Sequence, residues 1–273
     1  MSHNSWIYSE ETYRASTPYC KKDLLDPGYF RFSFNYGQAA AHEIKLKTDR
    51  HCDFNNGPAE VILNEIKSFW KQDGAYRDLG LAHKRSILMY GPPGCGKSGI
   101  VLSVIKQLVE MNGVAVSVDN IHHFKSALKV FRQIQPKTPI VAVIEDIDEQ
   151  VNAYETQFLE LFDGASSIGE DILFLSTTNK LEDIPERIRC RPSRIDTLIE
   201  IKYPSDEQRA EYVNFLTQNT NMGKSIKSDI VSLSEEFSLA DIKELVVSVY
   251  VYNKPKVLSI LQKMRTKKTD EEE

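Results

Sequence analysis

The residues with the clearest chemistry form a glycine-rich segment that ends in a lysine and a serine. The segment reads Gly91, Pro92, Pro93, Gly94, Cys95, Gly96, Lys97 and Ser98, and Gly99 follows it. This spacing fits a phosphate loop, in which backbone amides surround phosphate oxygens, the lysine binds the outer phosphates and the serine hydroxyl binds Mg²⁺. An apolar strand (87–90) precedes the segment and an amphipathic helix (100–111) follows it, so a helix N-terminus would face the anion. A chance Gly-Lys-Ser in a surface loop is the alternative, and this context argues against it.

Two neighbouring carboxylates provide the second part of such a site. Glu145 and Asp146 directly follow an apolar strand at 140–144, and open parallel sheets bind ligands at the carboxyl ends of their strands. We expect Glu145 to hold Mg²⁺ through water and Asp146 to orient the attacking water. The alternative is an acidic strand end that only faces solvent, and Asp148 and Glu149 fit that description.

These side chains need a sheet whose strands end side by side. Short apolar runs alternate with helical segments, at 87–90, 114–118, 140–144, 172–175 and 198–201. Strands that alternate with helices form a parallel sheet with helices on both faces, so the predicted fold class is α/β. A preceding helix is predicted from one apolar stripe, which consists of Ile62, Ile66, Phe69 and Trp70.

The regions on either side of this sheet differ from it. Strand-like stretches at 29–34 and 42–47 predict a small hairpin or an edge extension. Beyond Pro204 only helices are predicted, at 206–217, 228–237, 238–252 and 256–264. The predicted domains are an N-terminal β-rich extension (1–56), an α/β nucleotide-binding domain (57–203), a small helical lid domain (204–266) and a disordered charged tail (267–273).

Together these segments resemble the AAA ATPases, a family of P-loop proteins. The resemblance rests on the runs 62–70, 76–80 and 84–94 and covers roughly residues 57–252. It extends to a subfamily of mitochondrial chaperones that translocate the Rieske iron–sulphur protein. In this subfamily, too, glutamate precedes aspartate at the strand end, whereas the usual order is aspartate then glutamate. The family resemblance implies ATP hydrolysis with Mg²⁺ in a homo-oligomeric ring, a hexamer or similar. The subfamily's substrate is not carried over, because residues 1–56 are unrelated to its N-terminal region.

The resemblance also implies roles for residues beyond the phosphate loop. Asn179, which follows a strand, matches the polar sensor that touches the attacking water or the terminal phosphate. Arg191 and Arg194 match arginine fingers, which reach the phosphates bound by the neighbouring subunit and stabilise charge in the transition state. An Arg-rich stretch also suits anion binding on physical grounds. A solvated basic loop is the alternative.

Two segments depart from the family pattern. Ala240 matches the part of the lid that covers the base and phosphates, but Leu239 stands where the family usually has glycine. Family members that thread polypeptides carry an aromatic residue and a glycine in a pore loop after the second strand. The corresponding segment here, 119–125, has no glycine. Phe124 is a weak substitute, and packing in the core is the alternative for its side chain.

The amino-acid composition limits the classes of partner that we expect. The 273 residues include 34 basic and 39 acidic side chains, giving a formal charge of −5, so there is no global basic field of the kind that drives non-specific nucleic-acid binding. The four cysteines are far apart and favour free thiols in a reducing compartment over a zinc site; they are Cys20, Cys52, Cys95 and Cys190. No stretch approaches the roughly 18 to 20 apolar residues that span a bilayer, and we expect a cytoplasmic protein without membrane contact.

Three functions follow from these observations. The first is a ring-forming ATPase that remodels an unknown protein or protein assembly. The second is a DNA-linked machine such as a clamp or helicase loader, because 178–186 also resembles clamp loaders, although the acidic net charge argues against it. The third is an assembly module that binds ATP and barely hydrolyses it, which the reversed carboxylates keep open.

Overall fold

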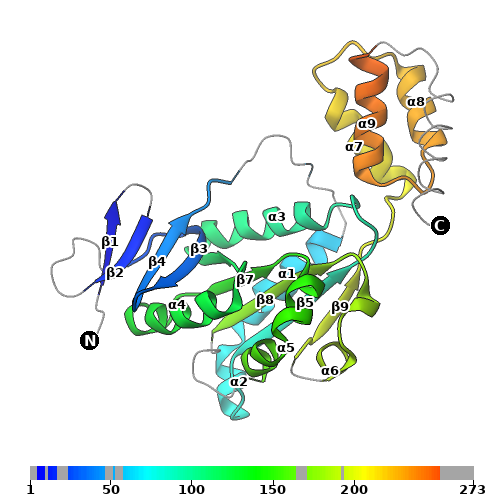
Figure 1. Ribbon diagram of the computed structural model, residues 1–273. Coiled ribbons are helices and arrows are strands. Elements are labelled where there is room, and N and C mark those ends of the chain that lie inside the picture. The colour runs from blue at the N-terminus through cyan, green and yellow to red at the C-terminus, as the bar shows by residue number, and fades with distance from the viewer. Residues whose placement is uncertain are drawn as a thin grey trace.

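The computed structural model describes residues 5–9, 12–16, 24–46, 52, 58–163, 171–191 and 194–252. Its strands form one 9-stranded sheet in the order β1-β2-β4-β3-β6-β7-β8-β5-β9 (Figure 1). The strands are β1 (Ser5–Ser9), β2 (Thr12–Ser16), β3 (Gly28–Asn35), β4 (Gln38–Glu43), β5 (Lys84–Tyr90), β6 (Val114–Ser117), β7 (Ile140–Ile144), β8 (Ile172–Thr178) and β9 (Thr197–Glu200). From β3 to β9 all neighbours in this order are parallel, whereas β1, β2 and β4 are antiparallel to their neighbours. The predicted α/β class is confirmed.

Helices cover both faces of the parallel part of this sheet (Figure 1). They are α1 (Pro58–Lys71), α2 (Asp73–Asp78), α3 (Lys97–Glu110), α4 (Ile121–Ile134), α5 (Ile147–Phe162) and α6 (Glu186–Arg189), with a short 3₁₀ turn, η2 (Leu181–Asp183). Ile87 and Met89 of β5 pack with α1 and α3, whereas Leu88 packs with α4 and α5. Because these strands are buried on both faces, they read as continuous apolar runs in the sequence.

The N-terminal hairpin belongs to the same sheet and to its core. β3 pairs in parallel with β6, and β4 returns after a turn at Tyr36 and Gly37, both of which have positive φ. Phe32 of β3 contacts the rings of Phe124 and Phe131 in α4, at centroid distances of 6.4 and 5.7 Å. The expected hairpin is present, and it extends the edge of the parallel sheet.

The second strand of this hairpin lies earlier than the sequence pattern predicts. The prediction was 42–47, whereas β4 is Gln38–Glu43 and residues 44–46 have no regular structure. Ala39 and Ala41 point into the core and are 0% exposed. Alanine has little strand propensity, so the inward-facing positions gave no recognisable signal.

The C-terminal helices form a separate bundle beside the sheet (Figure 1). They are α7 (Asp206–Thr217), α8 (Lys224–Leu233) and α9 (Leu239–Tyr250), and they enclose a small core that includes Val213, Ile230, Phe237, Ile242 and Leu245. α7 has the predicted bounds and α9 lies within the predicted range. None of the helices in the described part of the chain is both long and apolar enough to cross a bilayer.

The position of α8 corrects a prediction. A helix was expected at 228–237, but α8 ends at Leu233 and Phe237 reaches the bundle core from the connection before α9. Its apolar side chain therefore marks the core and not a helix. The helix expected at 256–264 and the tail at 267–273 lie outside the described residues.

Candidate functional site

The phosphate loop connects β5 to α3, and three of its glycines have positive φ. The φ angles are 147° at Gly91, 74° at Gly94 and 101° at Gly96, values that residues with a Cβ rarely adopt. A Cβ on Gly91 would lie 2.0 Å from the carbonyl oxygen of Ile201, so only glycine fits where the loop passes the end of β9. Gly96 directly precedes α3. The loop therefore ends at a helix N-terminus, whose free amides attract an anion.

The Lys97 ammonium is held inside the curve of this loop. Its Nζ donates to the carbonyl oxygens of Gly91 at 2.6 Å and Pro92 at 3.0 Å, and to Asn179 Oδ1 at 2.8 Å. Burial lowers the pKa of the Lys97 ammonium, and the nearby carboxylate of Asp146 acts in the opposite direction. Its present acceptors are neutral oxygens, so a phosphate in their place would form stronger, charge-assisted hydrogen bonds.

Asn179 and Asp146 lie beside this lysine. Asn179 Nδ2 donates to Asp146 Oδ1 at 3.4 Å, and the backbone amide of Asp146 donates to Thr177 Oγ1 at 3.2 Å. Asp146 has φ 47°, a left-handed conformation that is uncommon for a residue other than glycine. The structure thus brings the predicted lysine, the predicted sensor and the second carboxylate together, where β5, β7 and β8 end.

Glu145 lies apart from this group. Its side chain is exposed, and it is absent from the wall of the cavity described below. Its charge instead acts on Tyr29 of β3, whose pKa is raised mainly by burial and further by Glu145 and Asp119. Both residues lie in the turn between β7 and α5, where the left-handed backbone of Asp146 changes the direction of the chain. The division of roles between Glu145 and Asp146 stays a prediction.

A cavity of about 670 Å³ joins the phosphate loop, the strand ends and the lid helices, a size that suits a nucleotide. Of the predicted residues, its wall includes Pro93 to Gly99, Asp146, Asn179 and Ala240. Gly91 and Pro92 are outside this wall and hold Lys97 through their carbonyl groups. Sequence reasoning missed Cys52, Pro58, Tyr203, Gln208, Tyr212 and Lys243, which also line the cavity. No motif marks these residues.

The first residues of α9 contact the phosphate loop. The backbone amide of Ala240 donates to the carbonyl oxygen of Gly94 at 3.2 Å. A Cβ on Gly94 would lie 2.9 Å from the Ala240 Cβ, so the two segments pack closely. Leu239, which stands where the family has glycine, lines the cavity and approaches Gly96. Ala240 is therefore at the cavity, as the resemblance implied.

The two predicted arginine fingers differ in their surroundings. Arg191 is exposed. Arg194 is only 5% exposed, and its Nε and Nη2 donate to the two carboxylate oxygens of Asp163, each at 2.7 Å. A third bond goes from its Nη1 to the carbonyl oxygen of Arg187. Arg194 is thus bonded within its own subunit in this structure, and its role as an arginine finger stays a prediction.

The segment considered as a weak pore loop, 119–125, is mostly the first turn of α4. Asn120 caps this helix, and its side chain accepts hydrogen bonds from the amides of His122 and His123 at 3.0 and 3.1 Å. Phe124 is 1% exposed and belongs to the core beneath α4. Core packing, the alternative for Phe124, is confirmed.

The donor set of the cavity is compatible with Mg²⁺ bound together with phosphates. No group of three or more His, Cys, Asp or Glu side chains that could hold a metal ion occurs among the described residues. Mg²⁺ needs fewer protein ligands, because it usually keeps several waters and takes one or two protein oxygens beside the substrate phosphates. Ser98 lines the cavity and can provide one such oxygen through its hydroxyl, and a carboxylate that follows β7 can provide the second, directly or through water.

Known proteins share both sequence and fold with this chain. Residues 87–203 match the model of the ATPase family associated with various cellular activities (AAA). The chain is 26% identical over 240 residues to a mitochondrial sorting homolog of Caenorhabditis elegans, across 76% of this chain and 68% of that protein. It is 27% identical over 180 residues to the cell division control protein 48 homolog B of Arabidopsis thaliana, across 58% of this chain and 30% of that protein.

Two further matches extend this comparison. The proteasome-activating nucleotidase of Aeropyrum pernix is 26% identical over 197 residues, across 65% of this chain and 48% of that protein. The chain thus spans less than half of this relative and of the Arabidopsis one. The crystal structure of the FIGL-1 AAA domain in complex with ADP superimposes with a TM-score of 0.54 at 22% identity, over 74% of this chain and 71% of that one. That likeness establishes a shared fold.

Proposed function

We propose that the chain is an ATPase of the AAA type, whose family model matches residues 87–203. It binds ATP with Mg²⁺ in the cavity, hydrolyses it to ADP and phosphate, and works as a ring-forming oligomer. One observation carries the proposal. Lys97, Asn179 and Asp146, from three separate segments, are hydrogen-bonded in a row on one side of a nucleotide-sized cavity. If these three residues had only a structural role, they would not require a glycine-rich loop beside them.

Each part of the cavity has a task in this proposal. The amides at the start of α3 and the Lys97 ammonium bind the outer phosphates. Bound Mg²⁺ would neutralise charge on the phosphates, held by Ser98 and a carboxylate from the end of β7. Asn179 and Asp146 orient the attacking water in this proposal, and their hydrogen bonds in the row that begins at Lys97 support it.

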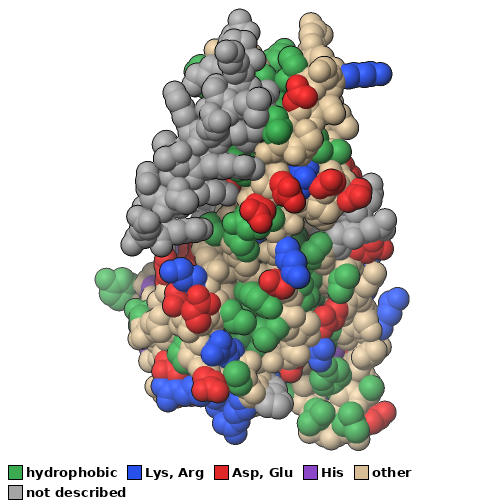
Figure 2. All heavy atoms as spheres, turned by 90° about the vertical axis from the view of Figure 1, so that its right-hand side faces the viewer, with side chains coloured by type: hydrophobic (Ala, Val, Ile, Leu, Met, Phe, Trp, Pro, Cys, Tyr) green, Lys and Arg blue, Asp and Glu red, His purple; other side chains and the backbone are tan. Residues whose placement is uncertain are grey.

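A protein or protein assembly is the proposed substrate of this ATPase. The names of two relatives support it: one is a mitochondrial sorting homolog and the other a proteasome-activating nucleotidase. The formal charge of −5 gives no support for a nucleic-acid substrate. On the face drawn in Figure 2, basic and acidic side chains are interspersed. Cytoplasmic localisation is part of the same proposal.

Turnover measurements test the proposed function. Phosphate release should require both ATP and Mg²⁺, and an unfolded protein should change its rate more than DNA does. Asp146→Asn serves as the matched variant that keeps the loop and Lys97. Binding without any Mg²⁺-dependent phosphate release would favour a nucleotide-gated assembly module, and stimulation by DNA alone would favour a DNA-linked machine.

A further inference from the structure

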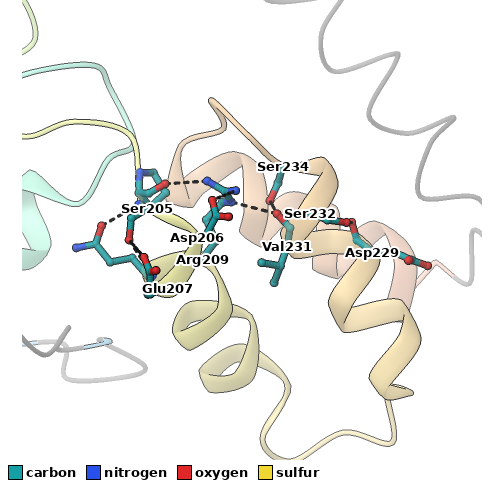
Figure 3. A network of polar contacts seen from close by, with 10 residues as sticks. Ser205, Asp206, Glu207, Arg209, Asp229, Val231, Ser232 and Ser234 are labelled. Carbon is teal, nitrogen blue, oxygen red and sulfur yellow. Dashed lines mark hydrogen bonds and ion pairs between the residues drawn. The ribbon is translucent and has the colours of Figure 1, made fainter.

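Arg209 is a buried arginine at the point where the lid joins the sheet. The connection from β9 ends at Pro204 and Ser205, and α7 starts at Asp206. Arg209 lies in the first turns of α7 and is 5% exposed, which is unusual for an arginine. Figure 3 shows its side chain directed between the start of α7 and Val231 of α8. A buried charge in this place calls for an explanation.

The guanidinium of Arg209 bonds to three different segments. Its Nη1 donates to the carbonyl oxygen of Pro204 at 3.0 Å, and its Nε donates to the carbonyl oxygen of Val231 at 3.1 Å (Figure 3). Its Nη2 donates to Asp206 Oδ1 at 2.6 Å. Val231 is in the last turn of α8, where carbonyl groups lack helical partners. One rigid, planar group thus fixes the connection, α7 and the end of α8 relative to one another.

Residues on either side of Arg209 face the cavity, although Arg209 itself does not. Pro204, Gln208 and Tyr212 all line the cavity. Gln208 is further fixed by a capping box, in which its Oε1 accepts from the Ser205 amide at 3.0 Å. Burial raises the pKa of Tyr212. The direction in which α7 leaves the connection therefore decides where these cavity-lining side chains lie.

We propose that Arg209 is a positioning residue for nucleotide binding: it sets the angle of α7 so that Gln208 and Tyr212 complete the part of the cavity that holds the nucleoside. This inference rests on the proposed function. The phosphate loop provides the phosphate end of the cavity, and its own contacts do not involve Arg209. A nucleotide bound there must extend its base and sugar toward the remaining wall, which the connection and α7 form.

The test compares a ligand that has a nucleoside with one that has only phosphates. Dissociation constants for ADP and for tripolyphosphate, both with Mg²⁺, are measured by calorimetry for the wild type and for Arg209→Met. The variant should bind ADP about tenfold more weakly, the order of effect that loss of hydrogen bonds from one charged group produces. Tripolyphosphate affinity should stay at the wild-type value, because the loop is unchanged.

Arg132→Met is the matched control. Arg132 of α4 also donates to two backbone carbonyl oxygens, those of Thr138 at 2.7 Å and Asp171 at 2.6 Å, but it is remote from the lid. This control should lower the melting temperature as Arg209→Met does and leave both affinities unchanged. If Arg209→Met does not fold, the affinities for ADP and tripolyphosphate are compared in Arg209→Lys instead, because lysine keeps the charge and loses the planar fork.

Three results have distinct meanings. Weaker ADP binding with unchanged tripolyphosphate binding supports the positioning role. An unchanged ratio of the two affinities in a folded Arg209 variant overturns it, because the residue then only stabilises the bundle. A wild type that binds neither ligand refutes the proposed function itself.

Discussion

At the scale of single residues, Lys97 is the first test of the phosphate site. Lys97→Ala should weaken ATP binding by roughly 10- to 100-fold, because hydrogen bonds to a charged group contribute about 1.5 to 3 kcal/mol. Equilibrium binding of a fluorescent ATP analogue measures this. Lys106→Ala, on the same helix but away from the loop, is the control and should bind normally. An unchanged affinity of Lys97→Ala for ATP would refute the assignment of this segment as a phosphate loop.

The two carboxylates after β7 make a second residue-scale prediction. Asp146→Asn should retain ATP binding and lower turnover by about 10²- to 10⁴-fold, the usual contribution of a general base. Glu145→Gln should also weaken the response to Mg²⁺, as the sequence interpretation implies. Glu149→Gln, exposed in the first turn of α5, is the control. Normal hydrolysis in Asp146→Asn, with an inactive Glu145→Gln that still binds Mg²⁺, would reverse the two roles.

Cys95 gives a third prediction about a single side chain. A thiol near a helix N-terminus tends to be reactive, but the Cys95 side chain is 6% exposed and packs in the core beneath α3. A small alkylating reagent should therefore modify the exposed Cys190 first, without loss of turnover. Modification of Cys95 should follow slowly, inactivate the ATPase and be prevented by bound ATP. Mass spectrometry measures the rate of modification at each cysteine, and an ATPase assay on the same samples measures turnover. Complete alkylation of Cys95 with full turnover would refute the prediction.

Single residues also show where sequence reasoning stops. Lys97 could be predicted because it belongs to the phosphate-loop motif, Asp146 because it lies two residues after an apolar strand, and Asn179 from the family resemblance. Tyr212 could not, since its position in the cavity depends on the angle at which α7 packs, and a helix pattern does not encode that angle. The pairing of Arg194 with Asp163 is equally invisible, because it joins residues that only the folded chain brings together.

At the scale of elements, β3 should be part of the folding core and not an appendage. Phe32→Ala should lower the free energy of unfolding by about 3 to 5 kcal/mol, as usual for a buried Phe, because Phe32 is 4% exposed and packs on α4. Denaturant titration measures this. Tyr36→Ala removes an aromatic side chain from the exposed turn of the same hairpin and should change stability by less than about 0.5 kcal/mol. If Phe32→Ala lowers the free energy of unfolding no more than Tyr36→Ala does, the hairpin is not part of the core.

The elements differ in how far the sequence predicts them. β7 has the predicted bounds because five consecutive apolar residues are buried on both faces. β4 was misplaced because its inward residues are alanines, and α8 was misplaced because Phe237 is apolar without being helical. Periodicity thus identifies elements whose burial is large and regular. It fails where small side chains or loops contribute to the core.

At the scale of the whole molecule, we predict that an arginine from a neighbouring subunit completes the site. Arg191 is exposed and lies outside the cavity of its own chain, whereas Arg194 is held by Asp163. If Arg191 acts across an interface, specific activity should rise with protein concentration as rings form. Arg191→Ala should bind ATP normally and lower turnover by about 10³-fold or more, as loss of an arginine finger does. Arg187→Ala, a neighbouring exposed arginine paired with Glu155, is the control.

Mixing two inactive variants tests this arrangement directly. An Arg191→Ala subunit keeps its phosphate loop, and a Lys97→Ala subunit keeps its finger, so some interfaces of a mixed ring would pair an intact loop with an intact finger. Hydrolysis should then exceed the sum of the separate variants, whereas the double variant mixed with either should give no gain. Rings that fire in a coordinated order would reduce the recovery without abolishing it. A wild-type chain that stays monomeric with ATP and Mg²⁺, yet hydrolyses at a rate per subunit independent of its concentration, would contain a complete site by itself and exclude an essential finger from its neighbour.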